Sequence, residues 1–194
     1  MKRNLFLLAA ISILFMSSCM NEKSSVKTES GTVIILNGPS AVGKSSIIKA
    51  FQTRRPEPWL SIGIDNFFVG VLPPKFYLES KPEHYPVMRG IASEDEQGKL
   101  FTLEVGAEGQ KVIQGMHLAI AAYAQAGNNV IVDYIKYEQP WIADLKNALQ
   151  GTKVIWVGVT ASLESIQQRE KSRGTSPEGH ARSHYHTVHQ NMNY

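Results

Sequence analysis

The 194-residue sequence has a single cysteine, Cys19, and no large excess of positive charge. One cysteine excludes an internal disulfide framework and a cysteine-based zinc site. Lysine and arginine total 20 against 17 acidic residues, and two of the positive charges, Lys2 and Arg3, lie in the first three residues. The remainder is therefore close to neutral and has no basic stripe, so we expect no nucleic-acid partner.

The sequence also lacks an apolar run long enough to cross a bilayer. The run Leu5–Met16, interrupted by Ser12, has about 12 residues, which is too short for a membrane-spanning helix. It follows Lys2 and Arg3 and leads into Met16-Ser17-Ser18-Cys19. This arrangement resembles a bacterial lipoprotein signal, with a lipid on Cys19 as the only predicted link to a membrane. A buried first helix is the alternative interpretation.

We therefore divide the chain into a signal at residues 1–19, a polar tether at 20–30 and one domain at 31–194. Apolar residues make up 43% of the chain and charged residues 19%. This composition is typical of a chain that forms a packed core rather than one that is disordered.

Strands and helices alternate along the predicted domain. Continuous apolar, β-branched runs are typical of strands buried on both faces of a parallel sheet, and they occur at residues 32–36, 60–64, 129–133 and 154–159. Helices are predicted at residues 44–52, 110–126, 139–149 and 162–171. Helices of this length between strands require crossover connections, and hence a parallel α/β sheet. Residues 66–109, with several prolines and aromatics, are predicted to be an irregular insertion on the substrate side, with short helices.

The segment from Gly38 to Ser45 reads GPSAVGKS and matches the pattern G-x-x-x-x-G-K-[ST] between a predicted strand and a predicted helix. Its glycines let the backbone wrap a phosphate, and the helix N-terminus attracts negative charge. Lys44 would contact the β- and γ-phosphates, and Ser45 would ligate Mg²⁺. The predicted ATP-binding residues are Gly38, Pro39, Ser40, Ala41, Val42, Gly43, Lys44, Ser45 and Ser46. The alternative is a glycine turn that caps a helix.

Two aspartates follow predicted strands, where the carboxyl ends of parallel strands line the ligand crevice of an α/β sheet. Asp65 either accepts the proton of a hydroxyl that attacks a γ-phosphate or caps the next helix. Asp133 follows Val-Ile-Val, as in a Walker B segment, and is predicted to bind Mg²⁺ together with Ser45. A simple turn at the strand end is the alternative for Asp133.

Arg169 and Arg173 are four residues apart near the end of a predicted helix, just before Gly174. Two guanidinium groups on one face suit a lid that closes on a transferring phosphate. The alternative is ordinary solvated charge at a helix C-terminus. A metal site is not predicted at the C-terminal histidines, which we interpret as part of a partly exposed polar helix. These histidines are His180, His184, His186 and His189.

Several of these segments resemble the chloramphenicol phosphotransferase-like family. The matching blocks are Val33–Ser46, Pro58–Asp65, Ala126-Gly127 with Val130–Asp133, Val154–Val159, Arg169-Glu170 and Arg173-Gly174. The resemblance implies a P-loop kinase fold with strand order 2-3-1-4-5 that transfers the γ-phosphate of ATP to an alcohol. It also implies that Asp65 is the catalytic base, acting with Lys44, and that Arg169 and Arg173 form a phosphate-facing lid.

The sequence departs from this family in three places. Residues 67–109 share little with its drug-binding stretch, so the predicted acceptor is a chloramphenicol-like antibiotic or a related alcohol rather than chloramphenicol specifically. Asp133-Tyr134 stands where the family often has two aspartates. The chain stops at Tyr194, where the family continues into a fifth strand and a closing helix. We therefore predict strand order 2-3-1-4, with Val154–Val159 as an exposed edge that favours self-association.

The predicted function is that of an ATP-dependent phosphotransferase acting on a small-molecule hydroxyl group. An exported, lipid-anchored nucleotide-binding remnant without turnover is one alternative, and a nucleoside-type kinase is another. The predicted location of the protein in the cell depends on which start codon is used. Translation from Met1 predicts a membrane-anchored lipoprotein, which would meet little ATP, whereas translation from Met20 predicts a cytoplasmic protein.

Overall fold

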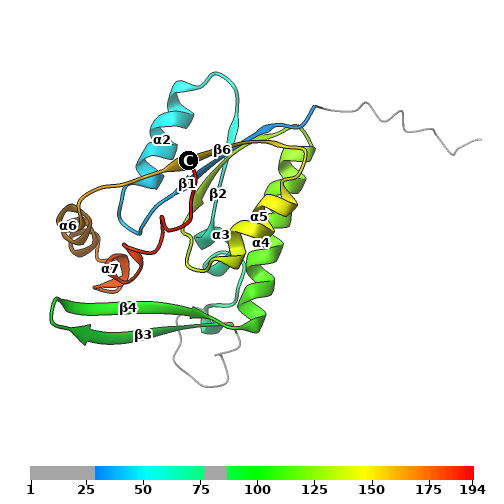
Figure 1. The fold of residues 1–194 in the computed structure, drawn as a ribbon. Coiled ribbons are helices and arrows are strands. Elements are labelled where there is room, and N and C mark those ends of the chain that lie inside the picture. The colour runs from blue at the N-terminus through cyan, green and yellow to red at the C-terminus, as the bar shows by residue number, and fades with distance from the viewer. Residues whose placement is uncertain (1–28, 77–86) are drawn as a thin grey trace, which may run out of the picture.

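A four-stranded parallel sheet forms the centre of the protein (Figure 1). The computed structural model describes residues 29–76 and 87–194. The strands of this sheet are β1 (Thr32–Asn37), β2 (Trp59–Gly63), β5 (Asn129–Tyr134) and β6 (Lys153–Gly158). Their spatial order is β2-β5-β1-β6, which confirms the predicted order 2-3-1-4. Val33 of β1 lies opposite Val130 of β5 and Val154 of β6.

Helices cover both faces of this sheet, as the continuous apolar strands require. They are α2 (Lys44–Arg54), α3 (Ile64–Phe68), α4 (Ala107–Gln125), α5 (Pro140–Ala148), α6 (Leu163–Arg173) and α7 (His180–His184), with a 3₁₀ helix, η2, at Pro74–Phe76. Ile120 of α4 and Leu145 of α5 are fully buried against one face. Ile48 of α2 and Ile166 of α6 fill the core on the other face. Each such side chain stabilises the fold by about 1.5–3 kcal/mol.

The prediction of an irregular insertion is wrong for residues 88–105. They form an antiparallel hairpin of β3 (Met88–Asp95) and β4 (Gly98–Val105), with Met88 opposite Val105. Its outer part is exposed, and a distant arginine holds it in place. Arg182 donates from Nη1 and Nη2 to the two carboxylate oxygens of Asp95, at 3.1 and 2.9 Å, and also donates to the hairpin carbonyls of Gly98 and Lys99. The anchor is 87 residues away in sequence, so local patterning did not indicate it.

The prediction of a partly exposed polar helix at the C-terminal histidines is wrong for His180 and His184, which are 7% and 4% exposed. The carboxylate of Glu170 accepts hydrogen bonds from the amides of Gly179 and Ala181 at 2.9 and 2.7 Å. These contacts hold α7 against α6, so α7 is buried between α6 and the hairpin rather than exposed to solvent.

The sheet edge and the N-terminal segment bear on two further predictions. In the described sheet β6 pairs only with β1, and Ile155 is 42% exposed. The ring of Tyr194 covers the end of this strand at Gly158.

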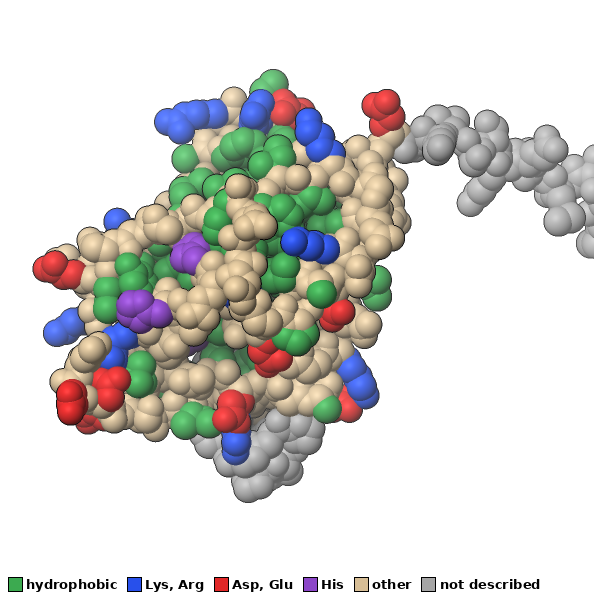
Figure 2. All heavy atoms as spheres, in the orientation of Figure 1, with side chains coloured by type: hydrophobic (Ala, Val, Ile, Leu, Met, Phe, Trp, Pro, Cys, Tyr) green, Lys and Arg blue, Asp and Glu red, His purple; other side chains and the backbone are tan. Residues whose placement is uncertain are grey.

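No helix among the described residues is long and apolar enough to cross a membrane. The predicted signal, Cys19 and most of the predicted tether lie outside the described residues. On the face drawn in Figure 2, lysines and arginines are scattered among acidic side chains.

Asn37 at the end of β1 joins three segments that are far apart in sequence. Its Oδ1 accepts the amide of Lys136 at 3.0 Å, and its Nδ2 donates to the carbonyl of Val188 at 2.9 Å and to Tyr194 Oη at 2.8 Å. The side chain is fully buried. Asn37 therefore ties β1, the segment after β5 and the C-terminal segment together.

Replacing Asn37 with leucine should lower the free energy of unfolding by about 2–4 kcal/mol, because it leaves two buried backbone groups without partners. Denaturant titration measures this difference. Asn147→Ala, at an exposed position near the end of α5, is the matched control and should change stability little. Equal unfolding midpoints for Asn37→Leu and the wild type would contradict the assigned role.

Candidate active site

The glycine-rich loop joins β1 to α2 and has two positions that require glycine. A Cβ on Gly38 would lie 2.4 Å from the carbonyl oxygen of Val159. Gly43 has φ = 110°, which an L side chain rarely adopts. Ala41, between them, has φ = 58° without being glycine. Successive amides in such a left-handed conformation point toward a common centre, as an anion-binding loop requires.

The amides of this loop fall into two groups. Those of Gly38, Ser40 and Val42 donate to Tyr134 O, His184 Nε2 and Pro39 O, respectively. Within the described chain, the amides of Ala41, Gly43, Lys44, Ser45 and Ser46 have no protein acceptor. The second group forms a row of free donors at the N-terminus of α2, and this arrangement suits a phosphate.

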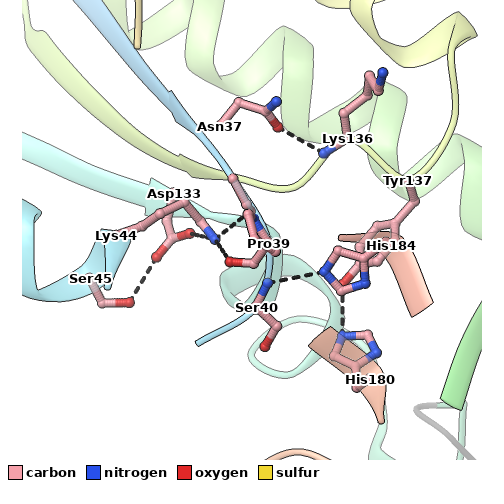
Figure 3. Close-up of polar contacts among 11 residues, drawn as sticks. Asn37, Pro39, Ser40, Lys44, Ser45, Asp133, Lys136, Tyr137, His180 and His184 are labelled. Carbon is pink, nitrogen blue, oxygen red and sulfur yellow. Dashed lines mark hydrogen bonds and ion pairs between the residues drawn. The ribbon is translucent and has the colours of Figure 1, made fainter. Parts of the chain in front are cut away.

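Lys44 folds back over the loop (Figure 3). Its ammonium donates to the carbonyls of Gly38 and Pro39 at 2.8 and 3.0 Å and lies 3.3 Å from Asp133 Oδ1. The side chain is only 5% exposed. Burial lowers the pKa of Lys44, and the neighbouring Asp133 carboxylate opposes that shift. The structure thus places this ammonium among the carbonyls of the glycine-rich loop.

Ser45 and Asp133, the two predicted magnesium ligands, are in direct contact. The hydroxyl of Ser45 donates to Asp133 Oδ2 at 2.8 Å. Hydroxyl and carboxylate oxygens are the hard donors that Mg²⁺ prefers, and this ion keeps several of its waters. These two residues therefore fit the ion. No group of three or more His, Cys, Asp or Glu side chains gathers as a metal site within the described residues.

Asp65 was predicted to follow directly after a strand. In the structure that strand, β2, ends at Gly63, and Asp65 is the second residue of α3. The helix-cap alternative does not fit, because Gly63 is the N-cap and its amide donates to Asn66 Oδ1 at 2.6 Å. Burial in the cleft is the main cause that raises the pKa of Asp65, and the negative charge of Asp133 is the second. The positive charge of Lys44 opposes the rise. The carboxyl group stays accessible to solvent, as an attacking hydroxyl requires.

The two arginines of α6 reach the same region in different ways. Arg169 donates from Nη1 to the carbonyl of Val42 at 2.9 Å, so it contacts the loop backbone. Arg173 lines the cavity, and its charge contributes to the lowered pKa of Lys44. Arg169 and Arg173 are both exposed, as solvated charge at a helix end would be, but the guanidinium of Arg169 is also bonded to the loop.

A cavity of about 350 Å³ connects these groups. The loop, Asp65, Asp133 and Arg173 line one part of it. The rest of the lining includes the polar residues Thr175, Ser176 and His180 and several apolar or aromatic side chains. The latter include Phe68, Val69, Met88, Phe101, Leu103 and Tyr137. The prediction that residues 66–109 lie on the substrate side agrees with Phe68, Val69, Met88, Phe101 and Leu103 in this lining, whereas Tyr137 and His180 were not predicted to belong to the site. The spacing of His180 and His184 was a signal, but the burial of the pair depends on the hairpin and α7.

A parallel sheet with this loop directly after its central strand β1, and with helices on both faces, is the fold of the P-loop kinases. The chain belongs to the chloramphenicol phosphotransferase-like protein family, whose model matches residues 31–194. The family and the kinase-like fold together support a phosphotransferase of the P-loop type.

Individual proteins support the same assignment. Two Mycobacterium tuberculosis proteins, from strains CDC 1551 and H37Rv, carry the name "Putative O-phosphotransferase". Each is 32% identical over 165 residues, which is 84% of this chain and 72% of the relative. A sugar kinase from Janibacter sp. HTCC2649 has a similar fold, with a TM-score of 0.53 at 15% identity over 84% of this chain and 80% of the kinase.

A chain of the Pnkp1/Rnl/Hen1 RNA repair complex also has a similar fold, with a TM-score of 0.58 at 13% identity. The match covers 84% of this chain but only 46% of that one, so this chain spans less than half of its length. At such identities the likeness concerns the fold alone.

Proposed function

We propose that this protein is an ATP-dependent phosphotransferase that moves the γ-phosphate to a hydroxyl group of a small molecule, such as a chloramphenicol-like antibiotic or a related alcohol. The observation that carries the proposal is the single cavity shared by the glycine-rich loop, Asp133 and Asp65. A phosphate-binding loop, a pair of magnesium ligands and an accessible carboxylate are the groups that transfer to an alcohol needs.

The loop and α6 would bind the phosphates. The free amides at the N-terminus of α2 donate to phosphate oxygens, and Lys44 exchanges its bonds to the loop carbonyls for bonds to the β- and γ-phosphates. Ser45 and Asp133 would hold Mg²⁺, which supplies charge neutralisation at the phosphates when it is bound. Arg169 supports the loop from outside through Val42.

Asp65 would act on the acceptor. Its ionised carboxylate takes the hydroxyl proton while the alcohol oxygen forms a bond to the γ-phosphorus. The bond between that phosphorus and the bridging oxygen breaks, and ADP leaves with the bonding electrons. Lys44 and Arg173 face the negative charge of the transferring group, where preorganised positive groups lower the barrier.

The lining of the cavity supports an uncharged acceptor with an apolar body. Phe68, Met88, Phe101 and Leu103 offer apolar surface, and Tyr137 and His180 add polar atoms at its edge. Of the lysines and arginines of the described chain, only Lys44 and Arg173 line this cavity, and both belong to the phosphate side. A second phosphate or a carboxylate on the acceptor would lack a cationic partner there.

The proposal is tested by incubating the purified protein with Mg-ATP labelled at the γ-phosphate and a panel of alcohols, amphenicol antibiotics and nucleosides. We expect label to pass to an uncharged alcohol, with one ADP formed for each phosphorylated product. Nucleotide binding without any labelled product would instead support the remnant without turnover. Label confined to nucleosides would support the nucleoside-type kinase.

A further inference from the structure

One amide of the glycine-rich loop is held by a side chain from the far end of the domain. The N–H of Ser40 donates to Nε2 of His184 at 3.0 Å, across 144 residues of sequence (Figure 3). In the loop, this is the amide that precedes Ala41, the first of the free donors. The contact therefore lies directly before the first free amide of the loop, that of Ala41.

His184 is set to accept this hydrogen bond. Its ring is packed against His180 and Tyr137, with ring centroids 4.9 and 5.0 Å away. Nε2 accepts only when the proton of the neutral imidazole is on Nδ1, and Nδ1 lies 3.4 Å from the hydroxyl of Ser183. Burial, the neighbouring His180 and the charge of Lys44 lower the pKa of His184 well below its ordinary value, which favours the neutral ring.

The helix that carries His184 is held on two sides. Glu170, which follows Arg169 on α6, accepts hydrogen bonds from the amides of Gly179 and Ala181 at the start of α7. Arg182, within α7, bonds the hairpin turn through Asp95 and the carbonyls of Gly98 and Lys99. With both sides of α7 fixed in this way, the position of the His184 ring is set by the tertiary structure rather than by the loop itself.

Ser40 precedes Ala41, a residue with a strained backbone that lines the cavity. Ala41 has φ = 58°, a left-handed conformation that costs an L residue conformational energy and persists only where the surroundings enforce it. Both residues line the cavity that holds Asp65 and His180. The bond to His184 fixes the peptide unit just before this strained position, and thereby the direction of the amides that follow.

We propose that His184 is a positioning residue for phosphate transfer: through Nε2 it holds Ser40, and so keeps Ala41 and the following loop amides directed into the cavity that contains Asp65. The role in transfer rests on the proposed function. The positioning of the loop does not, because it is a property of the protein without nucleotide.

The first test measures that positioning directly in the full chain without nucleotide. In His184→Leu, which keeps an apolar group of similar size but has no acceptor, we expect the Ser40 amide to exchange its hydrogen at least about tenfold faster than in the wild type. His184→Gln, whose side-chain oxygen can accept, should restore part of the protection. His186→Leu changes an exposed histidine two residues away and is the control. Unchanged Ser40 exchange in His184→Leu would overturn the proposal.

The second test measures transfer. With the alcohol that the wild type phosphorylates fastest, His184→Leu should lower kcat by about ten- to hundredfold, while Mg-ADP affinity measured by calorimetry falls much less, because Lys44 and the α2 amides remain. His184→Gln should recover part of kcat, whereas a purely structural role would lower the melting temperature and leave kcat per folded molecule unchanged. That second pattern would overturn the proposal. Absence of transfer by the wild type would contradict the proposed function instead, and the exchange test would still decide the role of His184.

Discussion

Replacing Lys44 with alanine is expected to remove most of the affinity for Mg-ATP, about a hundredfold or more, and to abolish measurable transfer. The ammonium is the charged group that the structure holds directly over the loop, 2.8 and 3.0 Å from the carbonyls of Gly38 and Pro39. Loss of a charged contact to a partner in a desolvated site typically costs 2–5 kcal/mol. Removal of one preorganised donor to the transition state lowers kcat by about 10²–10³-fold in addition.

Titration calorimetry with Mg-ATP and the labelled-phosphate assay measure these two effects. Lys44→Met keeps the length and packing of the side chain, so it separates loss of charge from a cavity at this buried position. Lys111→Ala is the control, because this lysine is 69% exposed on α4 and pairs only with Glu108 among the ion pairs of the described residues. Wild-type affinity in both Lys44 variants would show that the loop does not bind ATP in the way we propose.

Replacing Asp65 with asparagine should lower the rate of transfer by about 10²–10⁴-fold and leave Mg-ATP binding nearly intact. Asparagine keeps the shape of the side chain but cannot take up the hydroxyl proton. Asp65 is not the cap of α3, since Gly63 holds that position, so the substitution removes no helix-capping bond. Asp144→Asn, at an exposed position on α5, is the matched control. Unchanged turnover in Asp65→Asn would exclude a role as the base.

The pH dependence of the wild type gives a second measure of the same residue. Asp65 acts only when ionised, so activity is present above its pKa and is lost as the pH falls through it. Because desolvation and Asp133 raise that pKa above the ordinary value of 3.8, the acid limb should lie above that of a free carboxyl group. The rate should then fall about tenfold per pH unit, and Asp65→Asn should lack this limb.

Much of the site could be predicted because its residues lie at ends of strands in a parallel sheet. The pattern GPSAVGKS is local, and the strand before it and the helix after it are short-range features. Asp133 follows an apolar run and therefore ends at the same edge of the sheet as the loop. The structure shows the result of this geometry, with Ser45 Oγ 2.8 Å from Asp133 Oδ2.

The acceptor side of the cavity could not be predicted in the same way. In the strand that carries Phe101 and Leu103, residues 101–105 alternate between half-buried and exposed, which is a signal for a strand, but the outer part of the hairpin is polar and exposed. The hairpin is held by Arg182, and nothing in the sequence near Arg182 distinguishes it from other charged residues close to the C-terminus. The histidine pair in α7 looked like a polar surface for the same reason, since the partners that bury it come from the loop, the hairpin and α6.

The strand order was implied by the resemblance to the family. The sequence by itself determined the α/β class, the glycine-rich loop and the two carboxylates placed after strands. These features depend on hydrophobic periodicity and on contacts within a few residues, which a single chain displays directly. The tertiary structure alone decided that Arg169 supports the loop, that α7 is buried, and that His184 holds the Ser40 amide. The contacts of Arg169 and His184 join residues 127 and 144 positions apart, and the Arg182–Asp95 pair that holds α7 against the hairpin spans 87 positions, so no local pattern records them.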